Sequence, residues 1–115
     1  MGSPTITMRG NIAKAIEYRT VGNSGVARFR MMTNDRQKVK DTENEWEDKN
    51  SSGWNVEIWG NSAIKVRDHL ELGDPIIVIG TIFEDRWEDK VSGEPKFSLL
   101  VKAEAIGLDV GKVNN

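Results

Sequence analysis

One segment of the chain has the spacing of a helix, and it lies after three strand-like segments and before two more. Its apolar residues Ala63, Val66 and Leu70 recur at helical intervals. In the other segments apolar and polar residues alternate with a period of two, which is typical of strands with one buried face. The sequence therefore predicts an all-β domain with one helix, about residues 62–71, in the order β-β-β-α-β-β.

The alternation places the five expected strands at residues 6–12, 26–33, 54–59, 76–83 and 97–106. A single helix between the third and fourth strands is the order of the OB-fold, a five-stranded Greek-key barrel whose outer face binds oligonucleotides or oligosaccharides. A ferredoxin-like fold would need two helices, and a β-sandwich would have no place for this one. We therefore predict an OB-fold.

Glycine, proline and polar residues mark the boundaries of these elements. Gly10 interrupts the first strand where a coiled barrel strand needs a kink or bulge. Asn61 or Ser62 is expected to cap the helix. The polar stretch 34–53, which includes an acidic run, predicts a long solvated loop. The folded domain is expected to span residues 1–110, with 111–115 as a frayed tail.

Composition excludes several classes of function. The 115 residues carry a net charge of −2, so a nucleic-acid site must rely on local positive charge. Without cysteine and with one histidine, His69, the chain offers neither a Cys–His pair nor the usual zinc ligands. We expect no enzyme activity, no metal and no cofactor. The sequence contains no apolar run long enough to span a membrane and no signal peptide, so we expect a cytoplasmic, nucleoid-associated protein.

Four tryptophans are many for a chain of this length, and their positions indicate a function. Trp59 lies on the strand face opposite Val56, Trp87 lies among charged residues, and Trp46 lies in the acidic stretch. Exposed aromatic rings beside Arg and Lys suit single-strand binding without sequence preference, because every base has a π-face. Trp54 shares its strand face with the apolar residues Val56 and Ile58, so we expect it in the core or in an oligomer interface.

Basic residues near these rings are candidates for phosphate contacts. Arg28 and Arg30 project from one face of the second strand, and Arg9 projects from the first strand opposite its apolar residues. The further candidates near the aromatics are Lys14, Arg86 and Lys96.

The ordered set of motifs resembles the bacterial single-stranded DNA-binding proteins, the SSB family, over about residues 5–110. The motifs that carry the resemblance are Gly10-Asn11, Glu17-Tyr18-Arg19, Val26-Ala27-Arg28-Phe29-Arg30, Trp54-Asn55-Val56-Glu57-Ile58-Trp59-Gly60, Leu72-Gly73-Asp74-Pro75 and Arg86-Trp87-Glu88-Asp89. The likeness is to short-tailed paralogues that carry Leu-Gly-Asp-Pro before strand four. It implies a homotetramer that wraps single-stranded DNA in replication, recombination or repair. It also implies base stacking on Trp59 and Trp87, and it places Trp54 at a site associated with subunit contacts.

Three features differ from the family pattern. The aromatic residue that is usual just after strand two is replaced near Gln37, and Trp46 is a candidate substitute for it. Phe83 and Asp85 stand where basic residues are common, which predicts weaker binding. The acidic, Pro-Phe-ended tip that recruits repair proteins is not in this sequence, so either the sequence continues beyond it or such recruitment is not expected. Net acidity leaves open an alternative, an OB-fold module that binds protein and has no significant DNA binding.

Overall fold

The computed structural model describes residues 4–38 and 46–113, and it describes only the backbone at 34–38 and 46–52. The elements are, in order, β1 (Thr5–Ile12), β2 (Glu17–Val21), β3 (Ser24–Lys38), β4 (Trp46–Trp59), α1 (Asn61–His69), β5 (Pro75–Glu88), β6 (Pro95–Leu108) and the 3₁₀ helix η1 (Val110–Lys112). The predicted position of the helix, between the third and fourth barrel strands, is confirmed.

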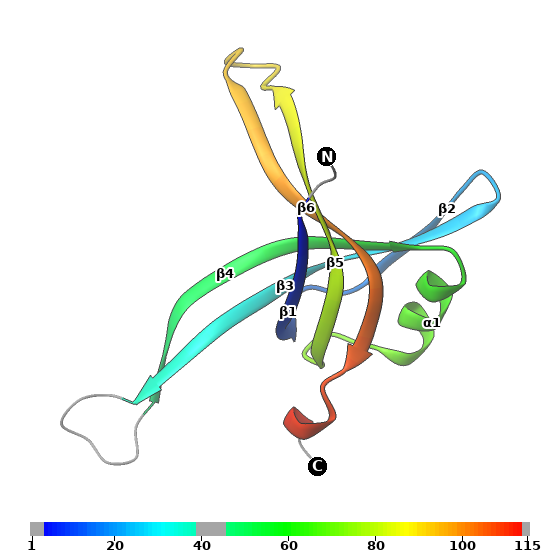
Figure 1. The fold of residues 1–115 in the computed structure, drawn as a ribbon. Helices are drawn as coiled ribbons and strands as arrows, with labels where there is room; N and C mark the ends of the chain where they lie inside the picture. The colour runs from blue at the N-terminus through cyan, green and yellow to red at the C-terminus, as the bar shows by residue number, and fades with distance from the viewer. Residues whose placement is uncertain (1–3, 39–45, 114–115) are drawn as a thin grey trace.

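The strands form one sheet in the order β1-β5-β6-β4-β3-β2, and a further pairing of β1 with β3 closes it into a barrel (Figure 1). The β4–β6 pair is parallel and the others are antiparallel. β1 and β2 together occupy the place of one barrel strand, since β1 pairs with β5 and β2 pairs with β3. The OB-fold prediction is therefore confirmed, with the correction that β2 was missed between the first and second predicted strands.

Closure depends on a close approach of two backbones at Gly10. A Cβ atom at this position would lie 2.1 Å from the carbonyl oxygen of Met32. Directly after it, Asn11 and Ile12 pair with Met32 and Met31 of β3. Only glycine lets β1 pass this close to β3 and change partners there.

Alternate residues of the strands fill the barrel, as the period of two predicts. The buried apolar side chains are Met8, Ile12, Val26, Ala27, Phe29, Met31, Val56, Ile58, Ile76, Val78 and Val101, together with Ala63 and Val66 of α1. Leu70 packs against this core from just beyond the helix. The predicted cap at Asn61 or Ser62 is wrong, because Gly60 takes the N-cap position with φ 78° and no side chain caps the helix.

Two hairpins extend away from the barrel, β3–β4 and β5–β6 (Figure 1). The prediction of a loop over residues 34–53 is wrong where the structure describes the backbone, since the β3–β4 pairing continues as far as Lys38 and Trp46. A polar sequence can continue a ladder because its partner strand satisfies the backbone hydrogen bonds, whatever the side chains. The β5–β6 pairing likewise continues to Glu88 and Pro95, and we call this extension the β5–β6 arm.

The tip of the β5–β6 arm is a tight turn organised by Asp89. Its Oδ1 accepts hydrogen bonds from the backbone N–H groups of Ser92 at 3.1 Å and Val91 at 2.8 Å. These bonds lower the pKa of Asp89, that from Ser92 most. The carboxylate therefore stays ionised and holds the turn at neutral pH.

At the C-terminal end β6 runs to Leu108, and η1 follows. The predicted frayed tail, 111–115, thus begins inside η1, and residues 114 and 115 lie outside the described part. Within the residues that the structure describes, the helices are too short and too polar to cross a membrane.

Candidate nucleic-acid interface

Strand register brings side chains of four strands onto one outward-facing surface, which we call the outer face. In the register Arg28 stands opposite Glu57, Arg30 opposite Asn55, and Asn55 beside Leu100. On the arm, Phe83, Asp85 and Trp87 stand opposite Leu100, Ser98 and Lys96. The outer face therefore comprises Arg28, Arg30, Asn55, Glu57, Trp59, Phe83, Asp85, Trp87, Lys96, Ser98, Leu100 and Lys102.

Three aromatic rings stand on this face with a large part of their surface exposed. Trp59 is 40% exposed, Phe83 38% and Trp87 49%. Trp59 ends β4 on the barrel, whereas Phe83 and Trp87 lie four residues apart on the same face of β5. The ammonium group of Lys102 lies 4.9 Å from the centre of the Phe83 ring, so a cation accompanies the smallest of the three rings.

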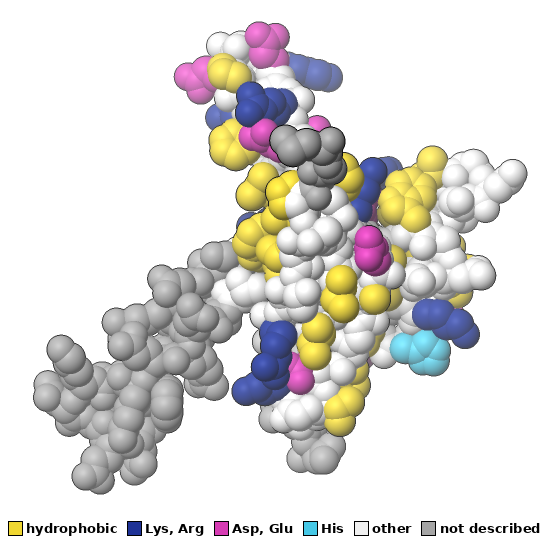
Figure 2. Space-filling view, in the orientation of Figure 1, with side chains coloured by type: hydrophobic (Ala, Val, Ile, Leu, Met, Phe, Trp, Pro, Cys, Tyr) yellow, Lys and Arg dark blue, Asp and Glu magenta, His cyan; other side chains and the backbone are white. Residues whose placement is uncertain are grey.

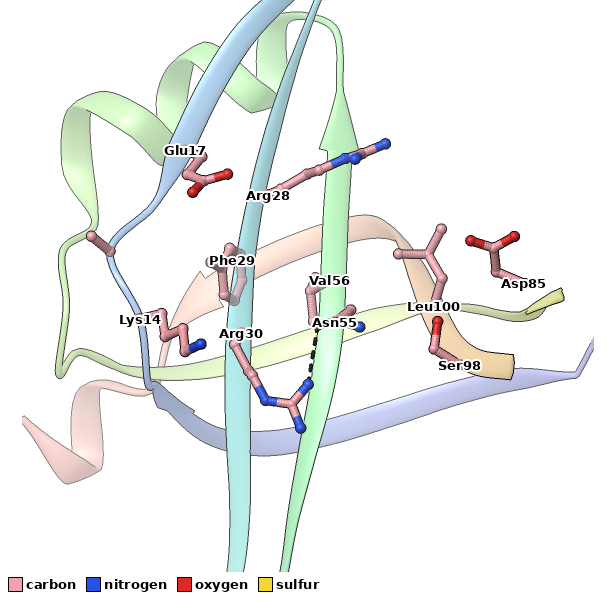
Figure 3. Close-up of a pocket in the computed structure, with 11 residues that line it drawn as sticks. Lys14, Glu17, Arg28, Phe29, Arg30, Asn55, Val56, Asp85, Ser98 and Leu100 are labelled. Carbon is pink, nitrogen blue, oxygen red and sulfur yellow. Dashed lines mark hydrogen bonds between the residues drawn. The ribbon is translucent and has the colours of Figure 1, made fainter. Parts of the chain in front are cut away.

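Between the barrel and the base of the arm lies a cavity of about 350 Å³. Lys14, Arg28 and Arg30 line it from the β2–β3 side, and Asp85, Ser98 and Leu100 line it from the arm (Figure 3). The cavity thus places three cations next to the aromatic surface, in a protein whose net charge is −2. The acidic residues Glu17 and Asp85 line the cavity as well, so its excess of positive charge is small.

Arg30 is held at this cavity by two neighbours. Its Nη1 donates to Oδ1 of Asn55 at 3.1 Å (Figure 3). A Cβ atom at Gly53 would lie 2.3 Å from Nη2 of Arg30 and 2.7 Å from its Cζ. The guanidinium group therefore occupies the space where any other residue at position 53 would place its side chain.

Glu57 joins Arg28 to Trp59. Its Oε2 accepts a hydrogen bond from Nε of Arg28 at 3.0 Å, and its Oε1 accepts one from Nε1 of Trp59 at 3.1 Å. Glu57 is 2% exposed although it belongs to the outer face. A buried carboxylate of this kind is stable because both of its oxygens have partners.

The structure separates two of the predicted basic residues from this cluster. Arg9 pairs with Asp109, with Nη2 and Oδ2 at 2.9 Å, and it is not among the residues that line the cavity. Arg86 alternates with Trp87 and so projects from the opposite side of the arm, where it pairs with Glu84 at 3.0 Å.

The remaining predicted residues divide in a similar way. Lys14 lines the cavity, and Lys96 stands opposite Trp87, with its Nζ 4.0 Å from Glu94. Trp54 is partly buried against the core, and its Nε1 donates to Oγ1 of Thr33 at 3.3 Å. The side chain of Trp46 lies outside the described residues.

Seven residues of the outer face were not binding candidates from the sequence: Asn55, Glu57, Phe83, Asp85, Ser98, Leu100 and Lys102. A period-two signal was available for five of them, since Phe83 and Asp85 share a strand face with Trp87, and Ser98, Leu100 and Lys102 share one with Lys96. The predicted strand ended at Phe83, so this alternation was not followed into the arm. For Glu57 no sequence signal exists, because a carboxylate on a polar strand face is usually solvated.

Charged side chains of both signs gather at the tip of the arm, with hydrophobic ones below them (Figure 2). This pattern favours a ligand that is bound by contact with rings as well as by charge. A strictly electrostatic surface would have few acidic groups among its cations.

Comparison with known proteins identifies relatives over nearly the whole chain. The single-strand binding protein family matches residues 4–109. The single-stranded DNA-binding protein of Corynebacterium glutamicum is 32% identical over 108 residues, which are 93% of this chain and 47% of that protein. Single-stranded DNA-binding protein 1 of Synechocystis is 29% identical over 100 residues, 87% of this chain and 76% of that protein.

The fold matches solved structures as well. The crystal structure of a small single-stranded DNA-binding protein from Streptomyces coelicolor aligns with a TM-score of 0.85 at 26% identity, covering 98% of this chain and all of that one. The chain spans about half the length of its Corynebacterium relative, so the match concerns the domain described above.

Proposed function

The chain belongs to the single-strand binding protein family, and from this premise we propose that it binds single-stranded DNA without sequence preference. Bases would stack on Trp59, Phe83 and Trp87, and Arg28, Arg30, Lys14 and Lys102 would contact phosphates. Each of the relatives described above is named for single-stranded DNA binding, which favours this role over that of a protein-binding module.

The observation that carries the proposal is the joint placement of rings and cations on the outer face. Trp59 and Trp87 come from strands far apart in the sequence, yet register assigns them to the same side of one sheet. The cavity with Arg28 and Arg30 lies between the barrel that bears Trp59 and the arm that bears Trp87. A single strand crossing this surface would meet a ring, then cations, then further rings.

This role requires binding alone, so we propose no catalytic activity for the domain. It would serve replication, recombination or repair, and its ligand would place it in the cytoplasm with the nucleoid. We further propose that the chain forms a homo-oligomer, in which several outer faces can engage one strand.

A titration of intrinsic tryptophan fluorescence with oligo(dT) tests the proposal. Stacking of thymine on Trp59 and Trp87 should quench the emission strongly, and a duplex of equal length should bind far more weakly because its bases are already stacked. Equal affinity for the duplex and the single strand would contradict the stacking mechanism. Absence of binding to either would contradict the proposed function itself.

A further inference from the structure

Glu57 is an acidic residue on a surface that is proposed to bind a polyanion, which is an unfavourable place for a negative charge. It is also 2% exposed, whereas the side chain of its partner Arg28 is 48% exposed. A solvated bystander would be exposed and would have no fixed partners. Glu57 is buried and has two fixed partners, so we look for its role within the interface.

The two hydrogen bonds of the carboxylate define that role. Oε1 takes the only N–H that the Trp59 ring can donate, so the ring has a fixed direction while its π-face stays open. Oε2 takes Nε of Arg28, which leaves the two terminal nitrogens of that guanidinium for a ligand. One buried carboxylate therefore orients a stacking ring and a phosphate-binding group together.

We propose that Glu57 is a positioning residue for single-stranded DNA, which acts through Trp59 and Arg28 without contacting the ligand. The inference rests on the proposed function, since it concerns the same outer face. Preorganisation of this kind lowers the conformational entropy that side chains lose on binding. The gain outweighs the repulsion between the carboxylate and the phosphates because Arg28 neutralises the carboxylate at 3.0 Å.

The variant Glu57→Gln tests the proposal because it keeps the size of the side chain and removes its charge. An amide has one acceptor oxygen, so it can satisfy either Trp59 or Arg28 and must turn its NH₂ group toward the other donor. We expect affinity for oligo(dT) to fall about three- to tenfold, the cost of leaving one or two side chains to be ordered on binding.

Asp85→Asn is the matched control on the same face. Asp85 lines the cavity and, among the described residues, its side chain has no hydrogen bond or ion pair with a neighbour. Removal of its charge should raise affinity, because the substitution removes only a repulsion of phosphate. If Glu57→Gln also bound more tightly than the wild type, Glu57 would be a repulsive charge and the proposal would be overturned.

A double-mutant cycle with Trp59→Phe separates positioning from a general loss of structure. Phenylalanine keeps a ring and lacks the N–H that Glu57 accepts, so in this background residue 57 can act only through Arg28. We expect Glu57→Gln to weaken binding less in the Trp59→Phe background than in the wild type. Equal losses in both backgrounds would contradict action through Trp59, and thermal melting of each variant would show whether the fold is retained.

The wild-type titration keeps the two ideas apart. If the wild type failed to bind oligo(dT), the proposed function would be wrong whatever the variants did. If the wild type bound and the cycle showed no coupling, the function would stand and the role of Glu57 would be refuted.

Discussion

Rings and guanidinium groups on the outer face contribute to binding through different physics, and salt distinguishes them. A base stacked on a ring gains contact at any ionic strength. A phosphate contact releases counterions and therefore weakens as salt rises. Trp59 and Arg28 meet at Glu57, so both kinds of contribution can be measured within one small cluster.

Trp59→Ala and Trp87→Ala should each cost about 1–3 kcal/mol of affinity for oligo(dT), the value of one base–aromatic stack. The slope of log affinity against log salt should stay unchanged, because no phosphate contact is removed. Phe97→Ala is the control. The Phe97 ring is 65% exposed and lies on the opposite side of the same arm, so its removal should leave the affinity unchanged. Wild-type binding by both tryptophan variants would assign these rings to a protein interface instead.

Arg28→Ala and Arg30→Ala should reduce the salt slope, by roughly 0.7 for each phosphate of the single strand that the protein no longer neutralises. Lys65→Ala, which removes an exposed charge from α1, should leave the slope as it is. The measurement is a titration with one oligonucleotide at several salt concentrations. An unchanged slope in both arginine variants would show that these groups serve the fold and do not contact phosphate.

The sequence predicts residues well where their pattern is local and poorly where their role depends on a partner strand. Trp59 and Trp87 were identifiable because alternation and charged neighbours exclude them from a core. Arg9 has the same local pattern as Arg28, and only tertiary structure brings Asp109 to it, 100 positions away in the chain. The role of Glu57 likewise exists only once β3 lies beside β4.

Among the elements, the barrel strands were predictable, and the lengths of the β3–β4 hairpin and the β5–β6 arm were not. Inside the barrel one face of every strand is buried, so hydrophobic alternation marks its extent. The sequence of residues 34–38 and 46–52 is mostly polar and shows no such alternation, although backbone pairing continues there. β2 was missed for a related reason, since only Tyr18 of its five residues is partly buried and no alternation marks it.

Closure of the barrel at Gly10 gives a prediction about stability. Gly10→Ala should lower the free energy of unfolding by about 1–3 kcal/mol, the usual cost of forcing extra atoms into a packed site, because the new methyl group would meet the Met32 carbonyl. Gly107→Ala is the control, since its Cβ would meet nothing within 4 Å. Urea denaturation of both variants provides the measurement, and equal stability would mean that β1 and β3 can separate at no cost.

On the scale of the whole molecule, the net charge is −2, and three basic residues line one cavity together with the acidic Glu17 and Asp85. Apolar side chains are exposed elsewhere on its surface, among them Ile79 at 45% and Leu108 at 42%. Ile79 faces outward from β5, on the side of the barrel where β5 pairs with β1. Ile79 is therefore a position at which contact with a second copy of the chain can be tested.

We expect a second copy of the chain to cover the surface around Ile79, in a homotetramer of four 12.9 kDa chains, about 52 kDa. Light scattering across a dilution series measures the mass directly. Ile79→Lys should reduce it, because a buried lysine without a partner opposes association. Val91→Lys, at the tip of the arm where the side chain is 98% exposed, adds the same charge and should leave the mass unchanged. A wild-type mass of 12.9 kDa at every concentration would contradict the tetramer. An unchanged mass for Ile79→Lys would place the interface on another surface. Phe97 and Leu99, which are exposed on the far side of the arm, would then be the next residues to test.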